Sequence, residues 1–150
     1  MITMHHLLEE KGHTVWSVGP DDTVLDAIKL MALKNIGALL VVEGGNGAGD
    51  GDGKPVGIFT ERDYARNVIL KGKSSPATSV RDVMAAPVIC VSPEKTVDDC
   101  MALMTEKRVR HLPVMDDGQL AGMISIGDLV KSIIEDQQHT IEQLEHYIHG

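Results

Sequence analysis

The sequence predicts a mixed α/β (α+β) fold built from two β-α-β-β-α repeats. The first observation is an internal repeat, because residues 18–42 match residues 91–115 without a gap. The second is the spacing of apolar residues, which in both copies changes from helical spacing to a continuous apolar run. The third is a pair of related decapeptides, "GIFTERDYAR" at 57–66 and "GMISIGDLVK" at 122–131. Together they indicate one supersecondary unit used twice.

Each copy opens with a short β-rich run, "TVWSV" at 14–18 and "PVICV" at 87–91. Thr23 and Thr96 then begin a helix, and an Asp three residues later resembles a capping box. Apolar residues follow at helical spacing and predict one buried helix face: Val24, Ala27, Ile28 and Met31 in the first copy, and Val97, Met101 and Met104 in the second. The next strand, "ALLVV" or "LPVM", is apolar throughout, which favours burial on both of its faces.

The third strand of each copy ends at a hydroxyl residue, and a second helix begins there. The two motifs are Thr60-x-x-Asp63 and Ser125-x-x-Asp128. Such a motif can cap a helix through the hydroxyl and the carboxylate. It can also hold a ligand, because a helix N-terminus binds anions and a carboxylate accepts hydrogen bonds from hydroxyl groups. From the residues alone both interpretations stay open.

The predicted organisation is a first repeat over 12–72, a linker over 73–87, a second repeat over 88–135 and a helical tail over 136–150. The tail outlasts the repeat, so we expect it to pack on a partner subunit or on the chain's own N-terminal segment. A glycine-rich loop carries Asp50 and Asp52, which is reminiscent of calcium ligands. Lys54 and Pro55 follow where an EF-hand loop requires an oxygen ligand and glycine, so a flexible connector is expected.

Composition narrows the classes of function. The chain has 150 residues and a formal net charge of −8, which argues against general nucleic-acid binding. No apolar run reaches the ~20 residues of a membrane span, and no signal peptide is evident. Cys90 and Cys100 lie in apolar patterns, so both are expected to be small buried side chains in a reducing compartment, and a cytoplasmic location is predicted. No P-loop, nucleophile elbow or metal-ligand pattern indicates an enzyme.

The two copies resemble a tandem pair of CBS domains, a family named after cystathionine β-synthase, of the stand-alone bacterial signalling type. The resemblance rests on residues 37–42 and 110–114, each followed by a Gly-h-h-Thr/Ser-x-x-Asp element (h, apolar), and on "VRDVM" at 80–84. It implies one pseudo-symmetric module without catalytic activity, which binds adenosine-containing ligands in the clefts between the repeats. The implied ligands are AMP, NAD(H), ADP and ATP, and the implied role is sensing of energy or redox state.

The resemblance also implies roles for single residues. It assigns the ligand's ribose to Asp63 and Asp128, beside the hydroxyls of Thr60 and Ser125. The phosphates are expected near Arg62 in the first copy, and near Arg110 and His111 in the second, where the first copy has Gly37 and Ala38. Adenine is expected against Ile58 and Met123. Trp16 either stacks on the base or belongs to the core.

Phosphate-bearing ligands are favoured over S-adenosylmethionine, which has no phosphate to bind the arginines. The two sites are expected to differ in affinity or in ligand. A homodimer is expected, together with a regulated protein that the sequence does not identify. An S-adenosylmethionine sensor and a purely structural dimerisation module remain the alternatives.

Overall fold

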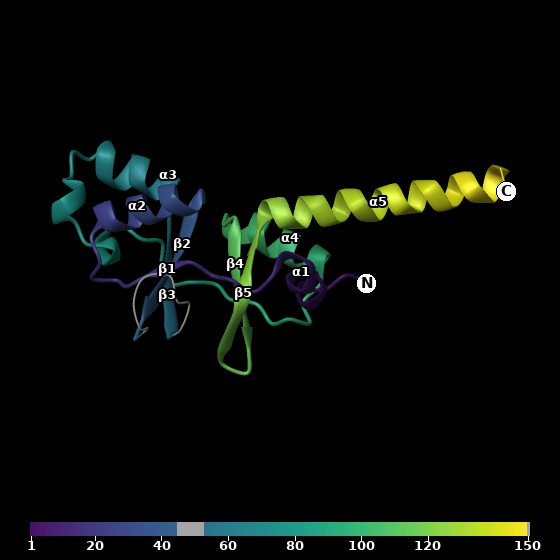
Figure 1. Ribbon diagram of the computed structural model, residues 1–150, viewed down its shortest axis with the longest axis horizontal. Coiled ribbons are helices and arrows are strands. Elements are labelled where there is room, and N and C mark those ends of the chain that lie inside the picture. Colours follow the sequence, from purple (N-terminus) through teal and green to yellow (C-terminus); the bar gives the residue numbers. More distant parts are fainter. Residues whose placement is uncertain (45–52, 150) are drawn as a thin grey trace. The chain divides into compact units, whose positions relative to one another are not determined.

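The computed structural model describes residues 1–44 and 53–149, and it divides into two compact units (Figure 1). The first unit is Thr14–Ile89. The second combines Met1–His13 with Cys90–Gly150. The mixed helix and strand content confirms the predicted fold class. The predicted connector at Asp50 and Asp52 lies outside the described residues.

The first unit contains a three-stranded sheet in the order β1-β2-β3. β1 (Ser17–Val18) pairs parallel with β2 (Ala38–Glu43), which pairs antiparallel with β3 (Lys54–Thr60). The first five residues of β2 are buried, as its continuous apolar run predicts. α2 (Val24–Lys34) follows β1 and contributes its apolar face to a core that also includes Phe59.

The two predicted helix starts at threonine are confirmed. Thr23 and Thr96 each accept a hydrogen bond from the backbone N–H three residues later, at 3.1 Å in both cases. They cap α2 and, in the second unit, α4 (Val97–Lys107). Among the described residues neither Asp26 nor Asp99 returns a bond to the cap, so these two caps are one-sided.

The chain after β3 forms a series of short helical turns. α3 (Glu61–Asp63) follows β3 and continues into a π-helical segment, η1 (Tyr64–Ile69). Two short 3₁₀ turns follow, η2 (Ser75–Ala77) and η3 (Val80–Asp82). The sequence predicts a linker here, yet Val80 is fully buried in the core of this unit. Ala85 then pairs with Ile58 through two backbone hydrogen bonds of 3.0 and 2.9 Å, so the chain lies along the free edge of β3.

The second unit repeats this plan with a different segment at the sheet edge. β4 (His111–Asp116) and β5 (Gln119–Ser125) form an antiparallel hairpin. The predicted first strand at 87–91 is reduced to one parallel bridge between Val91 and Val114. α1 (Met4–Lys11) packs on this unit, with Met4, Leu7 and Leu8 buried. Gly122 makes room for it, because a Cβ there would lie 2.5 Å from Leu8 Cδ2.

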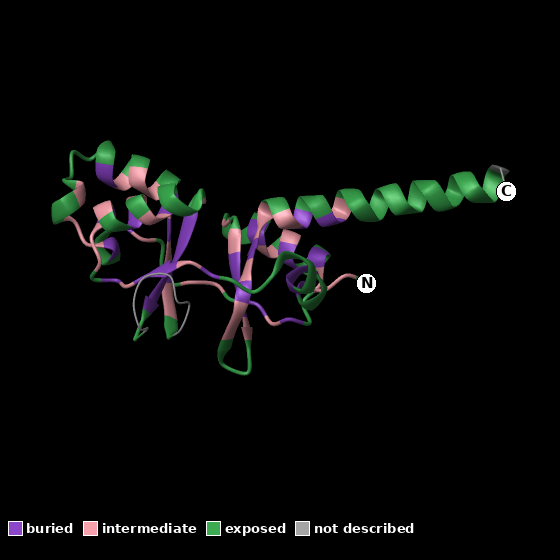
Figure 2. Cartoon of the chain, in the orientation of Figure 1, coloured by how far each residue is buried: buried purple, intermediate pink, exposed green. Residues whose placement is uncertain are grey.

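The chain ends in α5 (Ile126–His149), a helix of 24 residues. Its first turns pack on the unit and bury Leu129 and Ser132. Residues 134–148 are exposed throughout, as Figure 2 shows in green. Within the described part of the chain, no helix is both long and apolar enough to cross a membrane.

Candidate functional site

The Thr60–Asp63 motif forms a reciprocal cap at the start of α3. The Thr60 N–H donates to Asp63 Oδ2 at 3.0 Å, and the Asp63 N–H donates to Thr60 Oγ1 at 3.1 Å. The helix-cap interpretation is therefore confirmed for the first copy. The cap occupies only one carboxylate oxygen, and among the described residues Oδ1 of Asp63 has no hydrogen-bond partner.

The Ser125–Asp128 motif has the same geometry where β5 becomes α5. The Ser125 N–H donates to Asp128 Oδ2 at 2.8 Å, and the Asp128 N–H donates to Ser125 Oγ at 3.2 Å. The side chain of Asp128 is 26% exposed. Its Oδ1 also lacks a hydrogen-bond partner within residues 1–44 and 53–149. In each copy the aspartate thus caps the helix and keeps one oxygen available.

Lys11 adds a cation to the second motif. Its Nζ donates to Asp128 Oδ2 and to the Met123 carbonyl, both at 2.7 Å. The first motif has no counterpart, because no described Lys or Arg forms an ion pair with Asp63. Sequence reasoning missed Lys11 because it lies at the end of α1, outside both repeats and more than 100 residues from its partners. No signal in the sequence connects the two.

The ionisation of the second site follows from these contacts. Burial alone would raise the pKa of Asp128, but the hydrogen bonds from Lys11 and Ser125, with the charge of Lys11, lower it overall. His111 lies opposite Ser125 in the β4–β5 register. Burial lowers the pKa of His111, and the charges of Lys11 and Arg110 lower it further against the opposing charge of Asp128. At neutral pH the site therefore has a neutral imidazole, a carboxylate and two cations.

The first site differs in charge. The Gly37 carbonyl accepts the N–H of Glu61 at 3.0 Å, as the Arg110 carbonyl accepts that of Ile126 at 2.8 Å. A Cβ on Gly37 would lie 2.9 Å from Glu61 Oε1. The first copy therefore places a carboxylate where the second presents Arg110 and His111. Arg62 is exposed on the first turn after the cap, and no described residue forms an ion pair with it.

The residues predicted to contact adenine already form hydrogen bonds or packing contacts within the chain. Both backbone groups of Ile58 that face away from β2 bond to Ala85, and the Met123 carbonyl accepts from Lys11. The side chains of Ile58 and Met123 are half-buried. Trp16 packs against the core of the first unit, and Lys34 Nζ lies 4.0 Å from the centre of its ring. That cation covers one face of the indole.

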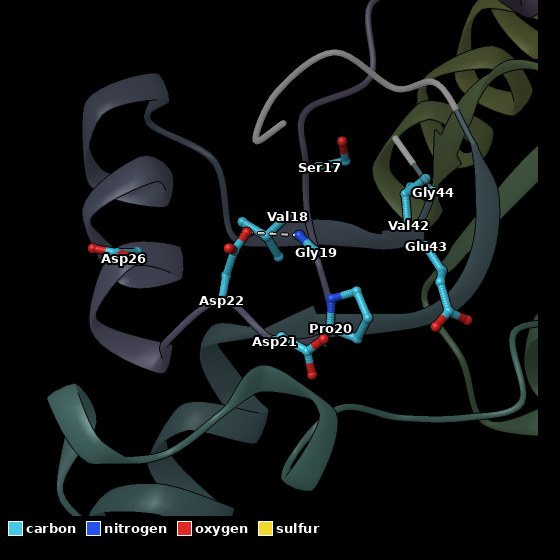
Figure 3. Close-up of a pocket in the computed structure, with 10 residues that line it drawn as sticks. All are labelled: Ser17, Val18, Gly19, Pro20, Asp21, Asp22, Asp26, Val42, Glu43 and Gly44. Carbon is cyan, nitrogen blue, oxygen red and sulfur yellow. Dashed lines mark hydrogen bonds between the residues drawn. The ribbon is translucent and has the colours of Figure 1, made fainter. Parts of the chain in front are cut away.

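Two surface hollows in the described part of the chain lie away from these motifs. The larger of the two, about 420 Å³ and shown in Figure 3, is in the first unit. It contains four carboxylates, from Asp21, Asp22, Asp26 and Glu43, and Asp22 accepts the Gly19 N–H at 2.7 Å. Arg81 pairs with Asp21 at 3.3 Å and with Glu43 at 3.8 Å, but the carboxylates outnumber it, so the lining repels phosphate. The smaller, about 270 Å³, lies in the second unit between the N-terminus, α4 and α5. In the described ranges no group of three His, Cys, Asp or Glu side chains is arranged to hold a metal ion.

The repeat, the caps and their spacing together define a class of protein, a tandem pair of α/β repeats with a capped helix after each third strand, and the comparisons with known proteins agree. The model of the CBS domain family matches residues 12–69 and again residues 80–135. The chain belongs to the CBS domain family, which confirms the predicted tandem pair.

Relatives with this organisation occur in plants and bacteria. The mitochondrial CBS domain-containing protein CBSX3 of Arabidopsis thaliana is 39% identical over 155 residues, which cover 99% of this chain and 72% of the relative. The solved structure of a CBS-domain protein from Burkholderia ambifaria MC40-6 is 54% identical, with a TM-score of 0.80, and covers 90% of this chain and 96% of that one. A hexameric CBS-CP12 protein from bloom-forming cyanobacteria is 28% identical, with a TM-score of 0.73, and covers 87% and 70%.

Proposed function

We propose that the chain is a non-catalytic sensor that binds a phosphate-bearing adenosine ligand at the Ser125–Asp128 motif. The observation that carries the proposal is the set of groups around one helix N-terminus. A capped carboxylate, a hydroxyl, Lys11 and His111 belong to the same unit and lie at the start of α5. The family supports the general class, because CBS pairs are typically regulatory modules for adenosine ligands.

Asp128 suits a ribose. Vicinal hydroxyls both donate, and a carboxylate only accepts. The cap and Lys11 both use Oδ2, which leaves Oδ1 for the ligand. The lowered pKa keeps this carboxylate ionised at neutral pH, so its oxygen remains an acceptor. Helix capping and ligand binding are therefore compatible at the same residue.

The cations suit a phosphate. The N-terminus of α5 carries a partial positive charge, although the N–H groups of Ile126 and Asp128 already have partners. Lys11 and Arg110 add two full charges beside it, and a bound phosphate would favour the charged form of His111. Charge-assisted hydrogen bonds contribute about 1.5–3 kcal/mol each, which is sufficient to discriminate among adenosines. S-adenosylmethionine lacks the phosphate that these groups would contact, so AMP or NAD(H) is preferred.

The first motif is proposed as a weaker or different site. Asp63 retains the free oxygen for a ribose, but the nearby Glu61 carboxylate opposes a phosphate, and Arg62 is the cation that the first copy offers in its motif. Titration of the full chain should therefore reveal two unequal classes of site. One class can hold a mononucleotide and the other a longer dinucleotide. The signal then passes to a regulated protein, and the cytoplasmic location remains a prediction alongside a mitochondrial relative.

Titration calorimetry of the full chain with AMP, ADP, ATP, NAD, NADH and S-adenosylmethionine tests the proposal. Asp128→Ala should weaken binding by about ten- to a hundredfold, because ribose hydroxyls without an acceptor cost about 1–3 kcal/mol. Asp116→Ala, on the exposed end of β4, is the matched control and should leave affinity unchanged. Arg110→Ala should weaken one class of site only.

Three outcomes would contradict the proposed ligand or its site. Unchanged affinity in a folded Asp128→Ala variant would leave the motif as a helix cap alone. Tighter binding of S-adenosylmethionine than of AMP and NAD would favour the sulfonium ligand instead. A chain that no ligand of the panel stabilises against heat would favour the structural dimerisation module, since a ligand at 100 times its Kd adds about 2.7 kcal/mol.

A further inference from the structure

α5 carries an exposed row of five apolar residues and one glutamine along one face. The row, called here the α5 stripe, consists of Val130, Ile134, Gln137, Ile141, Leu144 and Ile148. Gln137 also borders the smaller hollow of its own unit. Ile134 is 59% exposed, Ile141 48%, Leu144 57% and Ile148 72%. Large aliphatic side chains at these exposures, repeated along one helix, are costly to leave in water.

The positions and the width of the stripe identify the kind of partner. Its members are alternately four and three residues apart, which places all of them at the a and d positions of a heptad. A helix that packs on a globular surface has a wider stripe that includes e or g positions, whereas the flanking Gln138, Thr140 and Glu145 are polar here, as in the narrower seam of a coiled coil. The stripe also differs from the face that α5 buries at Leu129 and Ser132, which at 3.6 residues per turn lies roughly a third of a turn away. A second helix is therefore the partner that this row fits.

We propose that the α5 stripe forms a parallel, in-register coiled coil with α5 of a second copy of this chain. In heptad terms Ile134, Ile141 and Ile148 occupy a positions, and Val130, Gln137 and Leu144 occupy d positions. β-Branched residues at a with Leu at d favour a parallel two-stranded coil over trimers and tetramers. The same helix thus supplies both sides of the seam, with the residue type that a dimer prefers at every a position and at one d position.

The charges around the stripe also favour a second copy. Glu135 and Glu142 lie at b positions, outside the seam, where two paired helices would still expose them. The positions that flank the stripe, and that would meet across a parallel seam, pair Thr140 with Glu145 of the other copy and avoid like charges. A basic partner peptide would instead match a row of flanking carboxylates, which the stripe lacks.

Gln137 sets the register and the direction. It is the one polar member of the stripe, at a d position. In the parallel, in-register pair the two Gln137 side chains face each other, and each amide can donate to and accept from the other. In the antiparallel pair that aligns the stripe along its full length, each Gln137 faces Ile141 of the other copy, which leaves its amide without a partner. A single polar residue at an a position specifies register in known coiled coils, and the proposal gives Gln137 the same role at a d position.

The oligomeric state of the full chain tests whether the α5 stripe is a dimer interface. Sedimentation equilibrium should show a dimer for the wild type. Ile141→Lys should raise the dimer Kd by at least roughly a hundredfold, because the seam would bury facing ammonium groups. His139→Lys introduces the same side chain on the face away from the stripe and should leave Kd unchanged. A monomeric wild type, or an undiminished Ile141→Lys dimer, would overturn the proposal.

A cysteine at the seam tests the direction. Leu144→Cys in a Cys90→Ser background should form a covalent dimer under oxidised glutathione, because facing d positions lie within disulfide reach. Cys100 is buried, as the sequence predicts, and does not compete, whereas Cys90 is exposed, contrary to that prediction, and is therefore replaced. In the antiparallel arrangement the two introduced sulfurs would be about 15 Å apart along the helix axis, at 1.5 Å per residue. Cross-linking only between Ile134→Cys and Leu144→Cys chains would overturn the parallel register.

Discussion

At the scale of single residues, Lys11 has the largest effect on the second site. It neutralises Asp128, engages the Met123 carbonyl and raises the local positive potential at His111. In the first copy, no described Lys or Arg forms an ion pair with Asp63, the counterpart of Asp128. The difference between the two sites therefore arises from one side chain outside the repeats, as well as from the exchange of Gly37 for Arg110.

Lys11→Met should raise the pKa of both Asp128 and His111, because the charge of Lys11 lowers each of them. Carbon and proton NMR titrations of the carboxylate and the imidazole measure the two values separately. Arg110→Met is the matched control, since Arg110 lowers the pKa of His111 but is not among the causes acting on Asp128. A Lys11→Met variant with neither pKa changed would show that the ion pair does not form in solution.

Lys11→Met should also change how the free energy of unfolding depends on pH. A depressed carboxylate pKa stabilises the fold above the unfolded value, about 3.9, and this contribution is lost as the pH falls through the folded pKa. A depressed imidazole pKa likewise costs stability as the pH falls below about 6.5. The advantage of the wild type over Lys11→Met should therefore be largest at neutral pH, about 0.2–1 kcal/mol for a partly exposed pair, and shrink on acidification. Urea denaturation from about pH 2 to 8 measures it, since the carboxylate contribution is lost only below about pH 3.9.

At the scale of elements, each third strand accepts a packed segment at a glycine. Gly57 of β3 faces the segment that carries Met84 and Ala85, and Gly122 of β5 faces Leu8 of α1. A Cβ on Gly57 would lie 2.5 Å from Met84 Sδ and 2.9 Å from the Ala85 carbonyl oxygen. A Cβ on Gly122 would meet only the Leu8 side chain. Both copies thus have a glycine where another segment packs on the strand, but Gly122 should accept an added methyl group more readily than Gly57.

Gly57→Ala should cost more stability than Gly122→Ala. Overpacking costs about 1–3 kcal/mol, and a flexible leucine end yields more readily than a backbone carbonyl that is already hydrogen-bonded. We expect Gly57→Ala near the upper end of that range and Gly122→Ala near the lower end, measured by urea denaturation. Leu8→Ala combined with Gly122→Ala should relieve the clash and recover part of the lost stability. A larger loss of stability in Gly122→Ala than in Gly57→Ala would contradict this ranking.

At the scale of the whole molecule, each unit includes a segment that the predicted repeats leave out. For the second unit it is the N-terminal helix α1, and for the first it is part of the predicted linker. α1 caps one edge of the second unit, and residues 80–85 do the same for the first. The exposed half of α5 contributes to neither core. Stability and self-association should therefore be separable properties of this chain.

Truncation after Asp136 should separate them. The shortened chain keeps Leu129 and Ser132 buried, so its free energy of unfolding at dilution should stay within about 0.5 kcal/mol of that of the monomeric wild type. It should sediment as a monomer where the wild type is a dimer. A truncated chain that unfolds at much lower urea would show that the exposed half of α5 contributes to the fold itself.

The sequence by itself determined the two repeats, the four helix starts at Thr23, Thr60, Thr96 and Ser125, and the paired motif aspartates. These follow from local patterns, because apolar period, strand run and cap are set by residues only a few positions apart. The family followed from the order of those patterns. The ligand and the roles of the motif residues stay predictions.

Only the tertiary structure decided which distant groups meet at those motifs. Lys11 reaches Asp128 across 117 residues, Ala85 closes the edge of β3 at Ile58, and Glu61 covers Gly37. Such contacts leave no periodic trace in the sequence, since a charged or small residue at a surface position looks the same whether or not a partner faces it. The charge of each site, and so the expected difference between them, depends on where the folded chain brings these side chains together.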